Sequence, residues 1–508
     1  MTDPRNATPL LSDRIRQGHL IKQHRPWPRT AVDPAGWTAL ADGLAAGDWT
    51  LLGLWADVGA VHQALLDPAD GAIGVFSLDC ARSYPSVGRL HPPALRLERA
   101  LRDLFGLAPE GLPDPRPWLD HGRWGLRHPL GESRVAEPDG DPYAFLPAEG
   151  ESLHQIPVGP VHAGIIEPGH FRFSASGETV VRLEERLGYT HKGIEFLMRG
   201  ADLGRAARLA GRTSGDSGVA YQLAFARAVE AATGAEVPPR AQWLRALLAE
   251  LERLANHLGD IGAICNDAAF ALLHAECGIL REQVLRAAAE CFGHRLLWDR
   301  IVPGGVECNL GAATGKLLRA LLRQLRQRFP ALTELYDNTA SLQDRTVGTG
   351  VLAPALARQF GAGGFVGRAS GRAFDARRRP GYPPYDQLSF EVPVLEAGDV
   401  DARVWIRIRE VEQSLALVEQ LLDGLPDSAC RADIEPATGE GMALVEGFRG
   451  DVLVWLRLDA AGRVARCHLR DPSWFQWPLL EAVIEGNIVA DFPLCNKSFN
   501  CSYSGHDL

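Results

Sequence analysis

Apolar side chains recur at helical spacing along the middle of the chain. The run RAQWLRALLAELERLANHLGDIGAI, residues 240–264, places its leucines and Ile261 at intervals of three and four residues, which is the pattern of an amphipathic helix. Pro238 and Pro239 precede this run and suit a helix start. Similar spacing returns in 277–293 and 315–329. The pattern predicts a helical bundle core over about 215–345.

Shorter patterns on the N-terminal side predict a different architecture. The runs 49–58 (WTLLGLWADV) and 72–81 (AIGVFSLDCA) indicate strands, while 36–47 and 92–107 have helical spacing. A stretch rich in proline, glycine and acidic residues follows at 131–152, and this composition is typical of a linker. We therefore expect a small α/β domain over 1–130, a linker, and a second domain over 153–508.

Two β-hairpins are predicted within the second domain. Residues 171–188 contain two alternating apolar runs around Ser176 and Gly177, and 451–472 contain two more around Ala-Ala-Gly. The predicted fold class is α+β: a small α/β domain followed by a mainly helical bundle with β-hairpins.

Composition excludes some classes of function. The 508 residues are 46% hydrophobic and 23% charged, which is ordinary for globular proteins. The net charge of −10 argues against nucleic-acid binding, because phosphate neutralisation needs a concentrated basic surface. No uninterrupted apolar stretch is long enough to span a bilayer, and the N-terminal residues lack the apolar segment of a signal peptide.

The cysteines do not form a metal-binding pattern of their own. No two of them have CxxC spacing, so we expect reduced thiols in a cytoplasmic protein. The nine are residues 80, 265, 277, 291, 308, 430, 467, 495 and 501.

Two groups of residues are candidates for chemistry. His162, Glu167 and His170 lie within nine residues, followed by His191 and Lys192. Histidines and acids interleaved with glycine and proline suit proton handling, although single histidines more often have structural roles.

The second group precedes an apolar helix. Ser214, Asp216 and Ser217 lie in the run RTSGDSG. Because serine and aspartate accept hydrogen bonds from the first turn of a helix, residue physics alone favours helix capping here.

Nearly the whole chain resembles a known family. The runs LERALRDLFGL, GPVHAGIIEPGHFRF, YTHKGIEFL, RTVGTGVL, GRASG and NKSFNCSYSGHDL occur in family order. They are similar to the large subunit of complex-I-like nickel–iron hydrogenases of the formate hydrogenlyase type, and to the quinone-site large subunit of respiratory complex I. The N-terminal region resembles a small peripheral-arm subunit of complex I, fused to the large subunit.

The chain departs from this family at the metal ligands. The resemblance implies four cysteine ligands in two CxxC pairs, which here fall on Ser214 and Ser217, and on Ser502 and Gly505. Thiolates deprotonate easily and bind soft metals, whereas a serine hydroxyl is a hard donor and glycine has no side chain. We expect no nickel–iron centre and no metal ligands in this chain. The resemblance also implies a C-terminal extension that such hydrogenases lose after nickel loading, and because the sequence ends at Leu508 we expect none to be cleaved here.

The resemblance also implies a quinone as a candidate acceptor. Gly159, Pro160 and His162 match a loop of complex I whose histidine donates to the quinone, although Ala163 replaces a proline. The family's second donor, a tyrosine before the first ligand pair, has no counterpart, and Tyr221 or Tyr503 are the candidates to replace it. Glu167 resembles a proton-transferring glutamate, and His191 and Lys192 resemble a segment near a partner's iron–sulfur cluster.

Two hypotheses follow from the resemblance. In the first, the chain is an oxidoreductase subunit at the inner face of the cytoplasmic membrane, receiving electrons from a small iron–sulfur subunit. A ferredoxin-like subunit and antiporter-like membrane subunits are further expected partners, and any iron–sulfur cluster belongs to a partner. The acceptor cavity would contain His162, Glu167, His170, Ser214, Asp216, Ser217 and Ser502. In the alternative, the chain is a catalytically inert structural or coupling subunit of a related ion or inorganic-carbon transport complex.

Overall fold

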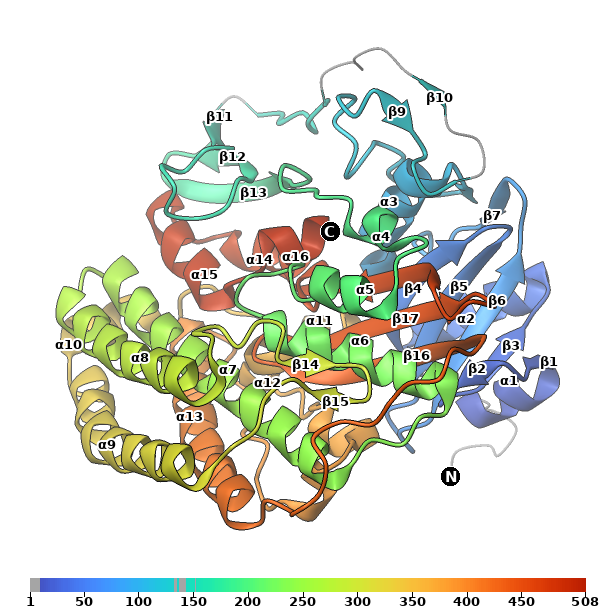
Figure 1. Ribbon diagram of the computed structural model, residues 1–508. Coiled ribbons are helices and arrows are strands. Elements are labelled where there is room, and N and C mark those ends of the chain that lie inside the picture. The colour runs from blue at the N-terminus through green and yellow to red at the C-terminus, as the bar shows by residue number, and fades with distance from the viewer. Residues whose placement is uncertain (1–9, 132–134, 137–142, 151) are drawn as a thin grey trace, which may run out of the picture.

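The N-terminal part of the chain is built around a five-stranded sheet (Figure 1). The computed structural model describes residues 10–131, 135–136, 143–150 and 152–508. The strand order is β1-β3-β6-β5-β4. Its strands are β1 (His19–Ile21), β3 (Arg29–Ala31), β4 (Thr50–Asp57), β5 (Ala60–Leu66) and β6 (Ile73–Asp79). The two strands predicted here are confirmed as β4 and β6, and β5 between them was not predicted.

Helices α2 (Pro34–Ala46) and α3 (Leu95–Phe105) pack against this sheet and agree with the predicted helices. Asp33 accepts a hydrogen bond from the Gly36 backbone N–H and Pro34 occupies the first turn, so α2 begins with a regular cap. Smaller elements complete the region: α1 (Leu11–Gln17), β7 (Ser83–Pro85), β8 (Ala108–Glu110), β9 (Leu126–Arg127) and β10 (Val135–Ala136). The predicted linker, 131–152, lies partly outside the described residues.

A second sheet joins the N-terminal part to the rest of the molecule. It has the order β18-β17-β16-β2 and contains β2 (His24–Arg25), β16 (Gly439–Gly447), β17 (Gly450–Leu458) and β18 (Val464–Arg470). The predicted hairpin at 451–472 is confirmed as β17 and β18. Leu52 and Trp55 of the first sheet pack against Leu453 and Trp455 of the second, so the two domains share a sheet-on-sheet core, and β2 extends the second sheet from the N-terminal side.

Helix α6 (Gly218–Thr233) covers the opposite face of the second sheet. A side chain at Gly441 would begin 1.8 Å from the carbonyl oxygen of Ala228. Glycine at this position therefore permits the close approach of β16 to α6.

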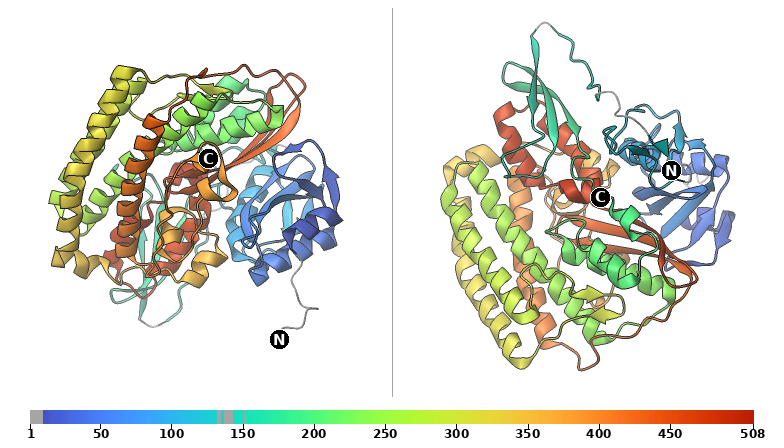
Figure 2. Two further views of the ribbon diagram at one scale, coloured as in Figure 1. Left: turned by 90° about the horizontal axis from the view of Figure 1, so that it is seen from below. Right: turned by 45° about the horizontal axis from the view of Figure 1, so that its top comes forward.

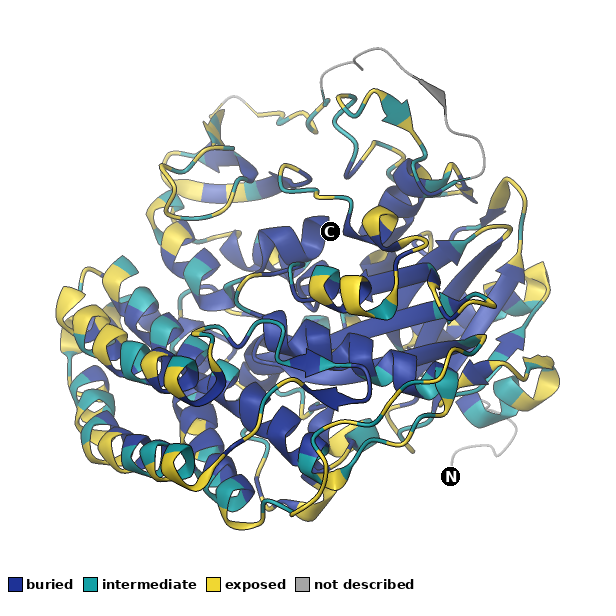
Figure 3. Cartoon of the chain, viewed as in Figure 1, coloured by how far each residue is buried: buried dark blue, intermediate teal, exposed yellow. Residues whose placement is uncertain are grey.

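The helical bundle consists of α7 (Pro239–Asp267), α8 (Ala271–Phe292), α9 (Ala312–Asp337) and α13 (Val400–Asp423). The first three match the predicted apolar stripes, and Pro239 occupies the first turn of α7. Helix α13 packs on both α7 and α9 but lies beyond the predicted bundle range. Exposed residues gather on the outer faces of α8 and α9, while α7 and the second sheet are mostly buried (Figure 3).

The C-terminal helices lie between the bundle, the second sheet and a three-stranded sheet (Figure 2). These helices are α14 (Ser473–Ile484), α15 (Phe492–Phe499) and α16 (Tyr503–Asp507), and the small sheet has β11 (Leu153–Val158), β12 (His170–Ser176) and β13 (Thr179–Arg186). The predicted hairpin at 171–188 is confirmed as β12 and β13. Further elements are α4 (Ile194–Met198), α5 (Leu203–Ala210), α10 (Ala340–Thr346), α11 (Pro354–Gln359), α12 (Gly364–Ala369), β14 (Ile301–Val302) and β15 (Gly305–Val306).

Candidate functional site

The loop before α6 meets the start of α16, although nearly 300 residues separate them in the sequence. The hydroxyl oxygens of Ser214 and Ser502 are 2.8 Å apart. Ser217 and Gly505 lie on the same two segments. The loop before α6 and the C-terminal segment thus bring together the four positions that the resemblance singled out. We call Ser214, Asp216, Ser217, Arg449 and Ser502 the serine pocket.

The hydroxyl groups of this pocket form one ordered chain of hydrogen bonds. The Gly505 backbone N–H donates to Ser502 Oγ over 2.9 Å, so Ser502 caps α16. Ser214 Oγ donates to Asp216 Oδ1 over 3.0 Å. Because the Ser214 proton points at the carboxylate, the Ser502 hydroxyl is the donor in the Ser214–Ser502 bond. Both hydroxyls are fully engaged and both residues are buried.

Asp216 is bound by Arg449, which the sequence did not single out. The Arg449 guanidinium donates to both Asp216 oxygens, at 2.5 and 2.6 Å, and to Ser217 Oγ at 3.1 Å. Burial raises the pKa of Asp216, but the Arg449 charge and the Ser214 hydroxyl outweigh it and hold the pKa below its usual value. Arg449 lies in the turn between β16 and β17, and its place in a Phe-Arg-Gly turn gave no sequence signal of a partner.

Helix capping by Ser217 or Asp216 was the prediction from residue physics, and it is wrong. Ser217 holds the N-cap position of α6 but makes no side-chain cap bond. Glu252 of α7 takes that role, accepting from the backbone N–H groups of Val219 and Ala220 at 2.7 and 3.1 Å. Burial raises the pKa of Glu252 to about 8. The loop side chains are therefore free to bind one another and Arg449.

The fourth position has no room for a side chain. A Cβ atom on Gly505 would lie 2.4 Å from Asp471 Oδ2 and 2.8 Å from Ser502 Oγ. Asp471 is held there by the Tyr221 hydroxyl, which donates to the same Oδ2 over 2.7 Å. Tyr221 is therefore fully buried behind the pocket, with its proton engaged. Cys501 is also buried, and burial raises the pKa of its thiol well above the usual value.

The predicted histidine group lies on the loop between β11 and β12 and at the start of β12, where His170 is the first residue. His162 Nε2 is 2.7 Å from the Gly169 carbonyl oxygen, and His170 Nδ1 is 3.3 Å from the Gly159 carbonyl oxygen. Burial lowers the pKa of His170. Glu167 reaches the serine pocket from this loop, since it accepts a hydrogen bond from the Ser504 backbone N–H over 3.2 Å. The structure brings Glu167 to the pocket, while its contacts hold the two histidines to their own loop.

His191 and Lys192, which follow the histidine group in the sequence, lie at the end of the chain and beside the pocket. His191 Nδ1 lies 2.7 Å from the Asp507 carbonyl oxygen, and its ring stacks on Trp124 with centroids 4.6 Å apart. Lys192 Nζ donates to the Thr213 carbonyl oxygen over 2.7 Å, directly beside Ser214. Burial lowers the pKa of Lys192, opposed by Glu167 and Asp507. Lys192 therefore borders the pocket.

Space beside the pocket is small. A cavity of about 20 Å³ borders Asp216, Glu252 and Asn256, which is room for about one water molecule. A larger cavity of about 630 Å³ lies between α5 and the segments around 301 and 433, and it contains none of the predicted site residues. Within the described part of the chain, no three His, Cys, Asp or Glu side chains are grouped as metal ligands.

No helix of the described residues is long and apolar enough to cross a bilayer.

Comparison with known families matches residues 267–436 and 428–507 to the 49 kDa subunit of respiratory-chain NADH dehydrogenase. Residues 72–138 match the 30 kDa subunit of the same enzyme.

Individual proteins are similar over most of the chain. Formate hydrogenlyase subunit 5 of Escherichia coli K12 is 33% identical over 84% of this chain and 77% of its own length. The carbon monoxide-induced hydrogenase of Rhodospirillum rubrum is 32% identical over 69% of this chain and 98% of its own length. An NADH-quinone oxidoreductase subunit of Syntrophobacter fumaroxidans is 32% identical over 69% of this chain and 95% of its own length.

A solved structure has the same fold. A chain of the membrane-bound sulfane sulfur reductase, an archaeal respiratory membrane complex, superposes with a TM-score of 0.67 at 27% identity. The match covers 70% of this chain and 99% of the other.

Proposed function

This chain belongs to the family of the 49 kDa subunit of respiratory-chain NADH dehydrogenase and the related hydrogenase subunits, fused to a 30 kDa-type domain, and from that membership we propose its function. It is the large subunit of a membrane-associated oxidoreductase complex that lacks a nickel–iron centre. It passes electrons from a partner's iron–sulfur cluster to an acceptor of the quinone class, coupled to ion translocation.

The observation that carries the proposal is the direct contact of Ser214 with Ser502 at 2.8 Å. The two hydroxyls hydrogen-bond across the place where the family's metal ligands meet, and each has its proton committed to a neighbour. Asp471 fills the side-chain space at Gly505. Neutral hydroxyls that are already hydrogen-bonded are poor ligands for nickel or iron, so these residues do not fit the metal centre.

The loop containing His162 supports a quinone-class acceptor. Val161 and Ile165 on this loop are 78% and 81% exposed, so an apolar rim flanks His162. The His162 Nε2–H donates to the Gly169 carbonyl oxygen, and a quinone carbonyl would replace that oxygen as its acceptor. Glu167 extends from this loop to the backbone N–H of Ser504, and Lys192 donates to the carbonyl oxygen of Thr213 beside Ser214. They offer a cation and a carboxylate that exchanges protons. A quinone takes up protons along with electrons. In this arrangement Lys192 would supply the cation, and Glu167 the carboxylate that exchanges protons.

The proposed partners follow the family. A small iron–sulfur subunit would dock near His191 and Lys192 and deliver the electrons. A ferredoxin-like subunit would precede it, and antiporter-like subunits would hold the complex on the inner face of the cytoplasmic membrane.

The test uses the purified whole complex. Metal analysis should find iron but no stoichiometric nickel, and a short-chain quinone should be reduced when the complex receives electrons. His162→Ala should reduce that rate at least tenfold with assembly intact. The control is His154→Ala, at an exposed position on neighbouring β11, which should leave the rate unchanged. Stoichiometric nickel, or full activity of His162→Ala, would refute the proposal.

A second candidate function is a structural or coupling role without redox chemistry. The specific observation in its favour concerns the two candidate replacements for the family's tyrosine donor. Tyr221 is fully buried and donates to Asp471, and Tyr503 is also buried, with its hydroxyl oxygen accepting from Asn496. In that case the assembled complex would bind no quinone and show no redox-linked signal, while removal of this subunit would still abolish ion transport.

A further inference from the structure

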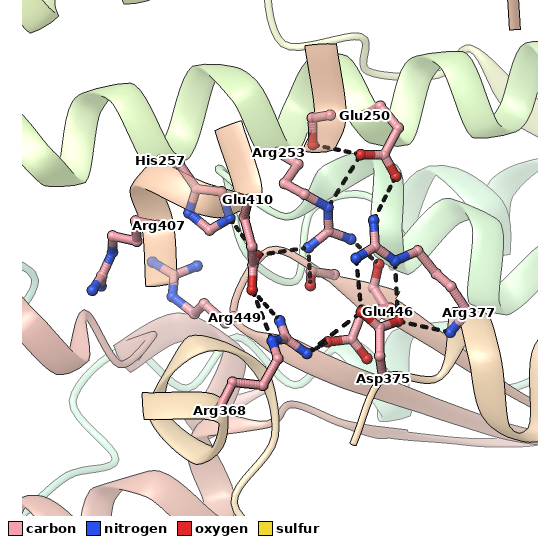
Figure 4. Close-up of polar contacts among 12 residues, drawn as sticks. Glu250, Arg253, His257, Arg368, Asp375, Arg377, Arg407, Glu410, Glu446 and Arg449 are labelled. Atoms are coloured by element: carbon pink, nitrogen blue, oxygen red, sulfur yellow. Dashed lines mark hydrogen bonds and ion pairs between the residues drawn. The ribbon is translucent and has the colours of Figure 1, made fainter. Parts of the chain in front are cut away.

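A second polar centre lies deeper in the molecule, between α7, α12, α13 and β16 (Figure 4). We call it the buried charge cluster, and each of its members is at most 3% exposed. The cluster consists of Glu250, Arg253, His257, Arg368, Asp375, Arg377, Glu410 and Glu446.

The cluster is one connected network. Arg368 is its centre, at 2.7 Å from Glu410, 2.8 Å from Glu446 and 3.5 Å from Asp375.

Its outer contacts close the network. Asp375 is also bound by Arg377 at 2.7 Å, and Arg377 reaches Glu250 at 2.9 Å. Arg253 connects Glu250 and Glu410, at 3.4 and 3.7 Å. A change of charge at any member is therefore felt by the others, because water does not screen them.

Two carboxylates of the network share one donor. Asp375 and Glu446 both face Nη1 of Arg368, at 3.5 and 2.8 Å. Like charges held this close at a buried site disfavour the ionisation of both carboxylates, and in practice one of them takes up a proton.

We propose that the buried charge cluster is a proton-binding site that holds one exchangeable proton on Glu446. The inference concerns the cluster itself and goes beyond the proposed electron transfer, whose test is separate.

His257 is the competing site for this proton. Its Nε2 lies 2.7 Å from Glu410 Oε2, while its Nδ1 has no hydrogen-bond partner among the described residues. A neutral ring with its proton on Nε2 satisfies the Glu410 contact, whereas a cation would leave a buried N–H without an acceptor. Burial also lowers the pKa of His257. The imidazole is therefore neutral.

Glu446 is the carboxyl group best placed to be protonated. The Glu250 carboxylate accepts hydrogen bonds from Arg377, Tyr385 and Ser414. The Arg377 guanidinium also donates to both oxygens of Asp375. Glu446 has only Arg368 and the Ala376 backbone N–H as side-chain partners among the described residues. Burial raises its pKa to about 7.

Groups from every surrounding element act on Glu446. Asp375 and, from β17, Asp451 favour its protonation, while Arg368 and Arg253 oppose it. The half-buried Arg372 also acts on it and opposes protonation. The Tyr382 hydroxyl contacts the Glu446 backbone N–H. These opposing effects leave the pKa of Glu446 near neutral, where a proton can be both taken up and released.

The site is connected to the serine pocket through one hairpin. Arg253 donates to the backbone carbonyl oxygens of Glu446 and Gly447, at 2.9 and 3.0 Å. Two residues further along the same turn, Arg449 binds Asp216. A proton on Glu446 therefore lies on the same β16–β17 hairpin that positions Arg449 in the serine pocket.

Infrared difference spectroscopy of the full-length chain tests the inference. A protonated carboxyl group shielded from water gives a carbonyl band that ionisation removes. Wild type minus Glu446→Gln should show one such band below pH 6, lost by pH 9 with a midpoint near 7. Glu334→Gln, at an exposed position on α9, is the matched control. Its own spectrum should keep the band, so that wild type minus Glu334→Gln shows none.

Two results would overturn the inference. One is an unchanged band in Glu446→Gln. The other is a nitrogen resonance of His257 that shows an imidazolium at neutral pH. This measurement needs only the wild type, so it remains decisive if Glu446→Gln does not fold.

Discussion

In the serine pocket, neutral hydroxyl groups satisfy one another, and Arg449 and Asp216 form a closed pair at a partly exposed edge. In the buried charge cluster, Arg368 serves three carboxylates with no exposure at all. Each includes a residue of the β16–β17 hairpin: Arg449 of its turn in the serine pocket, and Glu446 of β16 in the buried charge cluster. A hydroxyl network tolerates the change of a member because the remaining groups can rotate to new partners. An ionic network does not, because the loss of one member leaves a buried charge.

This difference predicts that the stability of the chain depends more on the buried charge cluster and the apolar bundle around it than on the serine pocket. The following predictions test this contrast, beginning with the largest expected effect.

Arg368→Met should be the most damaging substitution. It removes the guanidinium shared by Glu410 and Glu446, and the expected loss of unfolding free energy is about 3–5 kcal/mol. Chemical denaturation of the full chain measures it. Arg326→Met is the control, because Arg326 pairs with Glu419 at an exposed position and should cost less than about 1 kcal/mol. Equal losses in the two variants would mean that burial of the cluster does not matter.

Glu446 should make stability depend on pH. Its pKa rises from 4.5 in the unfolded chain to about 7 in the fold, so the folded state binds the proton more tightly. The stabilisation is complete below pH 4.5 and is lost as the pH rises through 7. Between pH 5 and 8, wild type should lose about 2 kcal/mol relative to Glu446→Gln. Denaturation midpoints at both pH values measure this, and parallel pH profiles of the two proteins would contradict it.

Much of the fold was predictable because it follows apolar periodicity. The stripes of α7, α8 and α9 and the alternation of β12 and β13 appear directly in the sequence. Helix α13 was missed because Arg403, Arg407 and Glu410 interrupt its apolar stripe, and their burial depends on partners from distant segments. Strand β5 was missed because His62 and Gln63 break its pattern, although both are buried.

The candidate site was predictable only in part. Family order places Ser214 and Ser502 at corresponding positions, and the structure brings them into contact. The role of Arg449 and the capping of α6 by Glu252 were not predictable, since each contact joins segments more than 30 residues apart in the sequence. Whether His162 and His170 take part in chemistry stays a prediction.

Ser502→Ala should have the smallest effect of the three substitutions. It removes the cap of α16 and the donor to Ser214, for an expected cost of about 1 kcal/mol. Ser152→Ala, at an exposed hydroxyl contact with Ser176, is the control and should cost less than about 0.5 kcal/mol. The same denaturation assay applies. If Ser502→Ala were as costly as Arg368→Met, the pocket would be part of the structural core, and the contrast between its hydroxyl network and the ionic network of the buried charge cluster would be wrong.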